Sequence, residues 1–203
     1  MSRRQILGLR TILTGASSGI GRCLALELAR QGARLVLTAR RREELEELQG
    51  LIRNLGRESH VVVGDIVDPA VRRRLLETAA SELGGLDLLI NNAGVGAIGP
   101  FAEASEARLR RVMEVNFFAP AELIRSAVPL LQAGQRPMIV NVSSVLGHRG
   151  IPKKSEYCAS KFALHGLSGD GGVVVDLGVG RVDHAEARLA SAEAVVREEV
   201  APG

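Results

Sequence analysis

The chain has 203 residues, 46% of them hydrophobic, which is enough to bury one core, so we expect a single domain over residues 1–203. It has one Tyr, no Trp and only 2% aromatic residues, which disfavours nucleic-acid binding because bases are usually stacked on aromatic side chains. The net charge is only +3, and we interpret the Arg residues mostly as solvated residues on helix surfaces.

The cysteines and histidines do not predict a metal site. Cys23 and Cys158 lie far apart, and the four histidines show no ligand spacing. The N-terminal residues contain no apolar run of secretory length, and no later stretch is long enough to span a bilayer. We therefore expect a cytoplasmic protein with no membrane span, no disulfide framework and no bound metal.

Short apolar runs recur along the chain with helical segments between them. The runs at residues 9–14, 34–38, 60–64, 86–90 and 137–142 are typical of strands buried on both faces of a sheet. Residues 20–31, 42–55, 69–83 and 106–131 have helical spacing, and Asp68-Pro69 supplies an N-cap and a first-turn proline. This alternation predicts an α/β fold, a Rossmann-like doubly wound parallel sheet with helices on both faces.

A glycine-rich turn, TGASSGIG from Thr14 to Gly21, joins the first predicted strand to the first helix. In such a turn Gly15 permits a tight bend, Gly19 lets the backbone approach a pyrophosphate, and Gly21 permits close packing of helix on strand. The candidate cofactor-binding residues of this turn are Gly15, Ser17, Ser18, Gly19, Ile20 and Gly21.

The spacing TGxxxGxG in this strand-to-helix context resembles the short-chain dehydrogenase/reductase family, and the resemblance extends over residues 9–168. It implies an oxidoreductase that binds a nicotinamide dinucleotide. At the end of the second strand Ala39 stands where an NAD-preferring member carries an acidic residue, and Arg40 follows. A missing carboxylate and an added guanidinium favour the 2′-phosphate, so we predict NADP(H) as the cofactor. Alternatively, Arg40 and Arg41 only open a charged helix.

Two further motifs follow in the order that the family has. Asp65-Ile66 after the third strand resembles the pair that contacts adenine in the family. Within Asn91–Gly94, the residues Asn92, Ala93 and Gly94 resemble the turn that lies beside the cofactor. Each motif could also be an ordinary turn at the end of a strand.

The only tyrosine, Tyr157, precedes Lys161 by four residues, so the two side chains share a face of a helix. A free phenol titrates near about 10, and a neighbouring ammonium stabilises the phenolate, so Tyr157 can act as general acid or base. The resemblance implies that Ser144, thirteen residues before Tyr157, hydrogen-bonds the substrate carbonyl, with Ser143 as the weaker candidate. It also implies that Asn116 holds a water in a proton relay to Lys161.

The catalytic set is therefore Asn116, Ser144, Tyr157 and Lys161, and Tyr157 and Lys161 also contact the cofactor. The reaction that the resemblance implies is hydride transfer between NADP(H) and a small-molecule carbonyl or alcohol. A homo-oligomer is compatible with the resemblance, since helices form the dimer interface in this family.

Beyond Ser168 the sequence departs from the family. The glycines of Gly169–Gly172 should end the catalytic helix early, and no Pro-Gly turn occurs before Pro202. Residues 173–179 have the composition of a strand and residues 184–199 that of a helix, so the C-terminal strands are expected to be incomplete. Residues 169–203 either cap the sheet edge or reflect a frame shift or aberrant splice. The alternative function is a catalytically impaired NADP(H)-binding or interaction protein; a third possibility is a misfolded product without function.

Overall fold

A computed structural model describes residues 5–168 of the chain. Its strands form one parallel sheet in the order β3-β2-β1-β4-β5, in which Leu13 lies opposite Leu37 on one side and Ile90 on the other. The strands are β1 (Arg10–Thr14), β2 (Arg34–Ala39), β3 (Ser59–Val63), β4 (Leu88–Asn91) and β5 (Met138–Asn141). The predicted Rossmann-like α/β fold is confirmed, and each predicted strand is found within two residues of its expected bounds.

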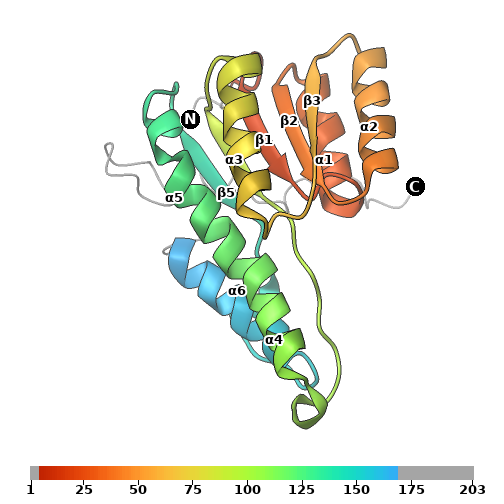
Figure 1. The fold of residues 1–203 in the computed structure, drawn as a ribbon, viewed down its shortest axis with the longest axis vertical. Coiled ribbons are helices and arrows are strands. Elements are labelled where there is room, and N and C mark those ends of the chain that lie inside the picture. The colour runs from red at the N-terminus through yellow and green to blue at the C-terminus, as the bar shows by residue number, and fades with distance from the viewer. Residues whose placement is uncertain (1–4, 169–203) are drawn as a thin grey trace, which may run out of the picture.

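Helices connect the strands and cover both faces of the sheet (Figure 1). They are α1 (Gly19–Arg30), α2 (Arg42–Asn54), α3 (Pro69–Thr78), α4 (Glu106–Met113), α5 (Ala119–Gln132) and α6 (Ser155–Ser168). The carboxylate of Asp68 accepts a hydrogen bond from the backbone N–H of Ala70 at 2.8 Å, which confirms the predicted N-cap of α3. Parallel strands need such crossover helices, and α1 and α2 lie within one residue of their predicted bounds.

The core consists of two apolar clusters, one on each face of the sheet. Leu13 and Leu37 belong to the cluster that includes Leu28 of α1 and Leu48 of α2. On the opposite face, the adjacent β1 residue Ile12 belongs to the cluster with α3 and α5. Successive side chains of a strand point to opposite faces, so nearly continuous apolar strands serve both clusters.

Two predicted helices are interrupted, which corrects the sequence analysis. Residues 69–83 form α3 followed by a π turn at Ala79–Leu83, and residues 106–131 form α4, a π turn at Glu114–Phe118, and α5. In the second π turn the N–H of Ala119 bonds the carbonyl of Glu114, five residues back. Pro120 follows and has no N–H to donate to the carbonyl of Asn116. The apolar period continues through the π turn, which is why the pattern predicted one helix.

The region around α4 and the start of α6 extends away from the sheet. Figure 1 shows α4, the start of α6 and the loop after β4 as a lobe below the carboxyl edge of the strands. In the part of the chain that the structure describes, no helix is long and apolar enough to cross a membrane. The strand predicted at 173–179 and the helix predicted at 184–199 lie outside the described residues, and the single-domain organisation of the whole chain stays a prediction.

Candidate active site

The turns after β1 and β4 meet at the carboxyl edge of the sheet, because these two strands are neighbours. The hydroxyl oxygen of Thr14 accepts hydrogen bonds from the backbone N–H groups of Asn92 and Ala93, each at 3.0 Å. The side-chain amide of Asn92 donates to the carbonyls of Thr14 and Gly15 at 3.0 and 3.1 Å. The sheet reverses its strand order between β1 and β4, and doubly wound proteins bind ligands at such a point.

The glycine-rich turn leaves no room for side chains at two positions. A Cβ on Gly21 would lie 2.2 Å from the carbonyl oxygen of Gly15, so α1 begins in direct contact with the turn. Gly15 has φ +70°, and a Cβ there would lie 2.7 Å from the Cα of Ala93. Both glycines are therefore needed for close backbone packing, as the motif predicted.

A cavity of about 350 Å³ opens at this edge, within the size range of ligand pockets. Every predicted cofactor-binding residue lines it except Gly19, the first residue of α1, and Tyr157 and Lys161 of α6. The lining residues that the sequence predicted are Gly15, Ser17, Ser18, Ile20, Gly21, Arg40, Asp65, Ile66, Asn92, Ala93 and Gly94. The cavity borders the N-terminus of α1, which favours an anion, so the residues present suit the pyrophosphate of a dinucleotide.

Arginine side chains lie at the end of the cavity beside β2. Arg40 is exposed, and Arg41 donates to the hydroxyl of Ser17 at 3.0 Å and pairs with Glu44 at 3.1 Å. Ala39 brings no carboxylate to this end. The contact between Arg41 and Ser17 was not predicted, because nothing in the sequence shows which of two adjacent arginines points to the turn.

Asp65 pairs with Arg111 of α4 across the cavity wall and also accepts from the backbone N–H of Val67 at 3.2 Å. Burial opposes ionisation of Asp65, but the hydrogen bonds from Arg111 and Val67 outweigh it and hold the pKa of this carboxyl below its ordinary value. Asp65 therefore stays an ionised hydrogen-bond acceptor in the cavity that Arg111 also lines.

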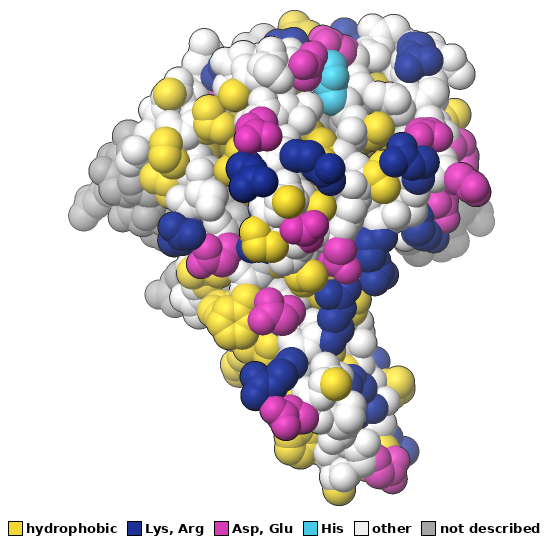
Figure 2. Space-filling view, viewed as in Figure 1, with side chains coloured by type: hydrophobic (Ala, Val, Ile, Leu, Met, Phe, Trp, Pro, Cys, Tyr) yellow, Lys and Arg dark blue, Asp and Glu magenta, His cyan; other side chains and the backbone are white. Residues whose placement is uncertain are grey.

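Three arginines form ion pairs with carboxylates far away in the sequence, which the interpretation of the arginines as mostly solvated did not include. Arg111 pairs with Asp65, Arg108 with Glu156 and Arg10 with Asp87. Figure 2 shows dark blue side chains where the lobe joins the body of the molecule, amid acidic and apolar ones. A charged residue in a helix pattern does not indicate which residue it will pair with. Because these partners lie far apart in the sequence, the pairs could not be predicted.

Tyr157 and Lys161 lie on one face of α6, with the lysine Nζ 5.8 Å from the centre of the phenol ring. Lys161 is 4% exposed and donates to the carbonyl of Val142 at 2.8 Å. Burial lowers the pKa of Lys161 from 10.5 to about 8. A Cβ on Gly94 would lie 3.8 Å from that Nζ and 3.4 Å from the amide oxygen of Asn116, so the turn after β4 touches both groups.

Asn116 is buried in the π turn and connects α6 to the loop after β4. Its amide oxygen accepts from the N–H of Val95 at 2.8 Å, and its amide nitrogen donates to the carbonyl of Val95 and the hydroxyl of Ser160, each at 2.9 Å. Ser160 in turn donates to the carbonyl of Tyr157 at 2.7 Å. The side chain of Asn116 is thus occupied by these bonds, and its backbone carbonyl receives no hydrogen bond from residue 120, which is proline.

Ser144 begins a short 3-10 turn at Val145–Gly147 that packs against α6. Its hydroxyl oxygen accepts from the N–H of Leu146 at 3.1 Å, so that bond does not use the hydroxyl proton. The neighbouring hydroxyl of Ser143 is buried and makes no hydrogen bond within the described residues. Both residues are half-buried, so the choice of Ser144 over Ser143 still rests on the spacing to Tyr157.

Comparison with known proteins gives relatives with dehydrogenase and reductase names. A hydroxysteroid 11-beta-dehydrogenase 1-like protein B of Xenopus laevis is 37% identical over 170 residues, which cover 82% of this chain and 58% of that protein. A 3-ketodihydrosphingosine reductase of Bacteroides thetaiotaomicron is 36% identical over 157 residues, with 77% and 55% covered. The chain thus spans a little over half the length of these two relatives.

Solved structures agree with the fold. A putative short-chain alcohol dehydrogenase from Sinorhizobium meliloti has a TM-score of 0.76 and 34% identity over 81% of this chain and 66% of its own. An NAD+-bound xylitol dehydrogenase has a TM-score of 0.77 and 28% identity, with 81% and 64% covered. The family model for short chain dehydrogenase matches residues 10–172, most of the chain. The chain therefore belongs to the short-chain dehydrogenase family.

Proposed function

We propose that the chain is an NADP(H)-dependent oxidoreductase that transfers a hydride between NADP(H) and a small-molecule carbonyl or alcohol substrate. The observation that carries this proposal is the buried Lys161, whose Nζ lies 5.8 Å from the ring of Tyr157 on a helix beside the dinucleotide cavity. Structural lysines are seldom this buried, and a cation here stabilises the phenolate form of Tyr157.

The residues have distinct roles in this proposal. Tyr157 gives a proton to the substrate oxygen in reduction and takes it in oxidation, while the hydroxyl of Ser144 donates a hydrogen bond to the same oxygen. Lys161, with a pKa lowered to about 8, exchanges a proton near neutral pH and so can reprotonate Tyr157. The backbone carbonyl of Asn116 holds the water that continues this path. When bound, NADP(H) supplies or accepts the hydride.

The preference for NADP(H) over NAD(H) rests on the end of the cavity beside β2. Ala39 offers no carboxylate there, and Arg40 and Arg41 line the cavity. Guanidinium groups bind phosphate by charge-assisted hydrogen bonds, whereas a ribose hydroxyl would need an acceptor. The glycine-rich turn would hold the pyrophosphate, and Asp65 with Ile66 would hold the adenine.

The substrate is proposed to be apolar, steroid-like or acyl-chain-like. Ile98 and Phe101 in the loop after β4 and Val145 after Ser144 are all more than half exposed, and such side chains suit an apolar ligand. The hydroxysteroid and ketodihydrosphingosine names of the relatives accord with this substrate class. A cytoplasmic location and a homo-oligomer stay predictions.

The test is Tyr157→Phe, assayed for NADPH consumption against a panel of apolar ketones and for NADPH binding by thermal unfolding. We expect turnover to fall roughly 10²- to 10⁴-fold because the proton donor is lost. The NADPH-induced rise in melting temperature should stay, since the glycine-rich turn and the arginines that line the cavity are unchanged. A wild-type chain that binds NADPH but turns over no carbonyl or alcohol would instead support the binding-protein alternative.

A further inference from the structure

A buried ion pair lies next to the proposed acid-base residue. Arg108 of α4 contacts one carboxylate oxygen of Glu156 with both Nε and Nη2, at 2.7 and 2.6 Å. The Glu156 side chain is 0% exposed, whereas that of Arg108 is 34% exposed. Glutamate is almost never fully buried without a partner, so the contact with Arg108 is what makes this position tolerable.

The pair is one-sided. Only Nε of Arg108 donates a hydrogen bond to Oε1; Nη2 of Arg108 and Oε2 of Glu156 are buried and have no hydrogen-bond partner in the described structure. The backbone N–H of Glu156 and the guanidinium of Arg108 hold the pKa of this carboxyl below its ordinary value, against the effect of burial. Glu156 is therefore ionised, and α4 pairs with it through the side chain of Arg108.

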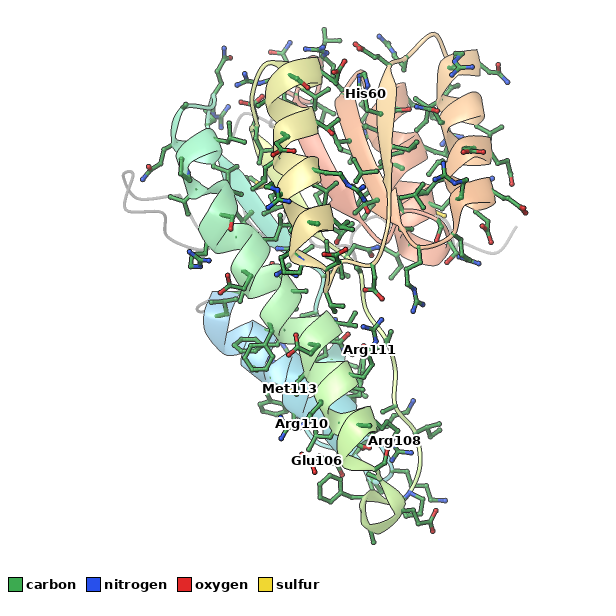
Figure 3. The ribbon with its side chains drawn as sticks, viewed as in Figure 1. His60, Glu106, Arg108, Arg110, Arg111 and Met113 are labelled. Carbon is green, nitrogen blue, oxygen red and sulfur yellow. The ribbon has the colours of Figure 1, made fainter. Side chains whose placement is uncertain are left out.

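The ion pair also lies beside the loop after β4, which is proposed to contact the substrate. A Cβ on Gly99 would lie 3.6 Å from Nη1 of Arg108, and the N–H of Gly99 donates to the carbonyl of Lys153 at 2.9 Å, just before α6 begins. In Figure 3 Arg108 and Arg111 lie on one side of α4, while Arg110 lies with Glu106 on the other. Residues three apart share a helix face, and the face of Arg108 is the one that meets α6 and this loop.

Tyr157 consequently lies between two anchors of α6. On one side Glu156 is held by Arg108, and on the other Ser160, which bonds the carbonyl of Tyr157, is held by Asn116. Apolar residues of similar volume often match or exceed the stability that a buried ion pair gives, so stability alone does not account for Arg108 and Glu156. An ion pair, unlike apolar packing, fixes the distance and direction between the two helices.

We propose that Arg108 and Glu156 are positioning residues that fix the first turn of α6 and thereby the orientation of the Tyr157 side chain. This inference rests on the proposed function only in that Tyr157 is taken as the acid-base residue. The placement of that side chain can be measured separately, because it is the only tyrosine in the chain. Misplacing a reacting group by about 1 Å can lower a rate roughly 100-fold.

The experiment uses Arg108→Ala, the double variant Arg108→Ala with Glu156→Gln, and Arg108→Lys, in the full chain labelled with fluorotyrosine. Fluorine NMR then gives one resonance, from position 157. We expect this resonance to move toward its unfolded position, or to broaden, in the first two variants, and to return toward the wild-type position in Arg108→Lys. Where turnover is measurable, kcat should fall roughly 10- to 100-fold while the Kd for NADPH stays within about twofold.

The double variant separates positioning from stability. Removing Arg108 alone strands a buried carboxylate, whereas the added Glu156→Gln replaces it with a neutral amide, so the melting temperature should recover while the tyrosine signal stays displaced. The control is Arg110→Ala, since Arg110 pairs with Glu106 at an exposed site on the same helix. A resonance that stays at its wild-type position in the double variant, or moves equally in Arg110→Ala, overturns the proposal. Absent turnover in the wild type would count against the proposed function alone.

Discussion

Two regions of this molecule are held together mainly by different kinds of contact. The nucleotide edge consists of the turns after β1 and β4 that line the cavity, and the proposed catalytic region surrounds Tyr157 and Lys161 of α6. At the nucleotide edge, the turn of Gly15 packs backbone on backbone against Gly21 of α1 and Ala93 after β4, and side-chain hydrogen bonds of Thr14 and Asn92 add to this packing. In the catalytic region, side-chain hydrogen bonds and ion pairs join separate helices, as Asn116 does with Ser160. Gly15 and Gly21 leave no space for a Cβ, whereas the second arrangement depends on particular polar groups.

This difference predicts how a substitution in each region affects folding, cofactor binding and catalysis. A substitution at a close backbone contact displaces whole elements and should affect folding and cofactor binding together. A substitution of a polar anchor in the catalytic region removes a bond but leaves the sheet in place, so its effect on catalysis can exceed its effect on stability. The following changes test this contrast.

The largest effect is expected for Gly21→Ala. The new Cβ would lie 2.2 Å from the carbonyl oxygen of Gly15, a backbone atom that cannot rotate away. We expect the free energy of unfolding to fall by about 3 kcal/mol and the NADPH-induced rise in melting temperature to disappear. Urea unfolding with and without NADPH measures both.

Gly50→Ala is the matched control. Gly50 lies within α2, and a Cβ there would have nothing within 4 Å. Because alanine favours the helix, this variant should gain about 0.5 to 1 kcal/mol and bind NADPH normally. If Gly21→Ala behaved like Gly50→Ala, close backbone contact would not be what holds the nucleotide edge.

The sequence predicted the features that depend on local patterns and missed those that depend on contacts between distant segments. The strands, the glycine-rich turn and the pairing of Tyr157 with Lys161 follow from local patterns, because apolar runs, obligatory glycines and helical spacing are visible in a short stretch of chain. The π turn around Asn116 and the pair of Arg108 with Glu156 were missed. They depend on contacts between segments up to 48 residues apart, for which a lone polar residue in a helix gives no signal.

A smaller effect is expected from Lys161→Met and depends on pH. The pKa of Lys161 is about 8 in the folded chain against 10.5 ordinarily, so between these values the unfolded chain binds more protons. The stability of the wild type therefore rises with pH in this window relative to Lys161→Met, which has no proton to lose. We expect this difference in unfolding free energy to grow by about 2 kcal/mol between about pH 8 and 10.

Unfolding in urea at a series of pH values measures this difference, and the interval from pH 6 to 7 serves as the internal control. Both folded and unfolded states keep Lys161 protonated there, so the difference should be constant. A difference that is constant up to pH 10 would mean that Lys161 is not buried as a charged group, and the proton exchange proposed for it would lose its basis.

The smallest effect is expected at the exposed end of the cavity, from Arg40→Ala. The Kd for NADPH should rise roughly tenfold, about 1.4 kcal/mol, while that for NADH should hardly change, because only NADPH carries the 2′-phosphate. Arg42→Ala is the control, since Arg42 pairs with Glu46 on the surface of α2 and does not line the cavity. Because Arg40 is exposed, added salt should shrink the effect. Equal losses for both cofactors would mean that Arg40 contacts a group they share, leaving the preference for NADP(H) to Ala39 and Arg41.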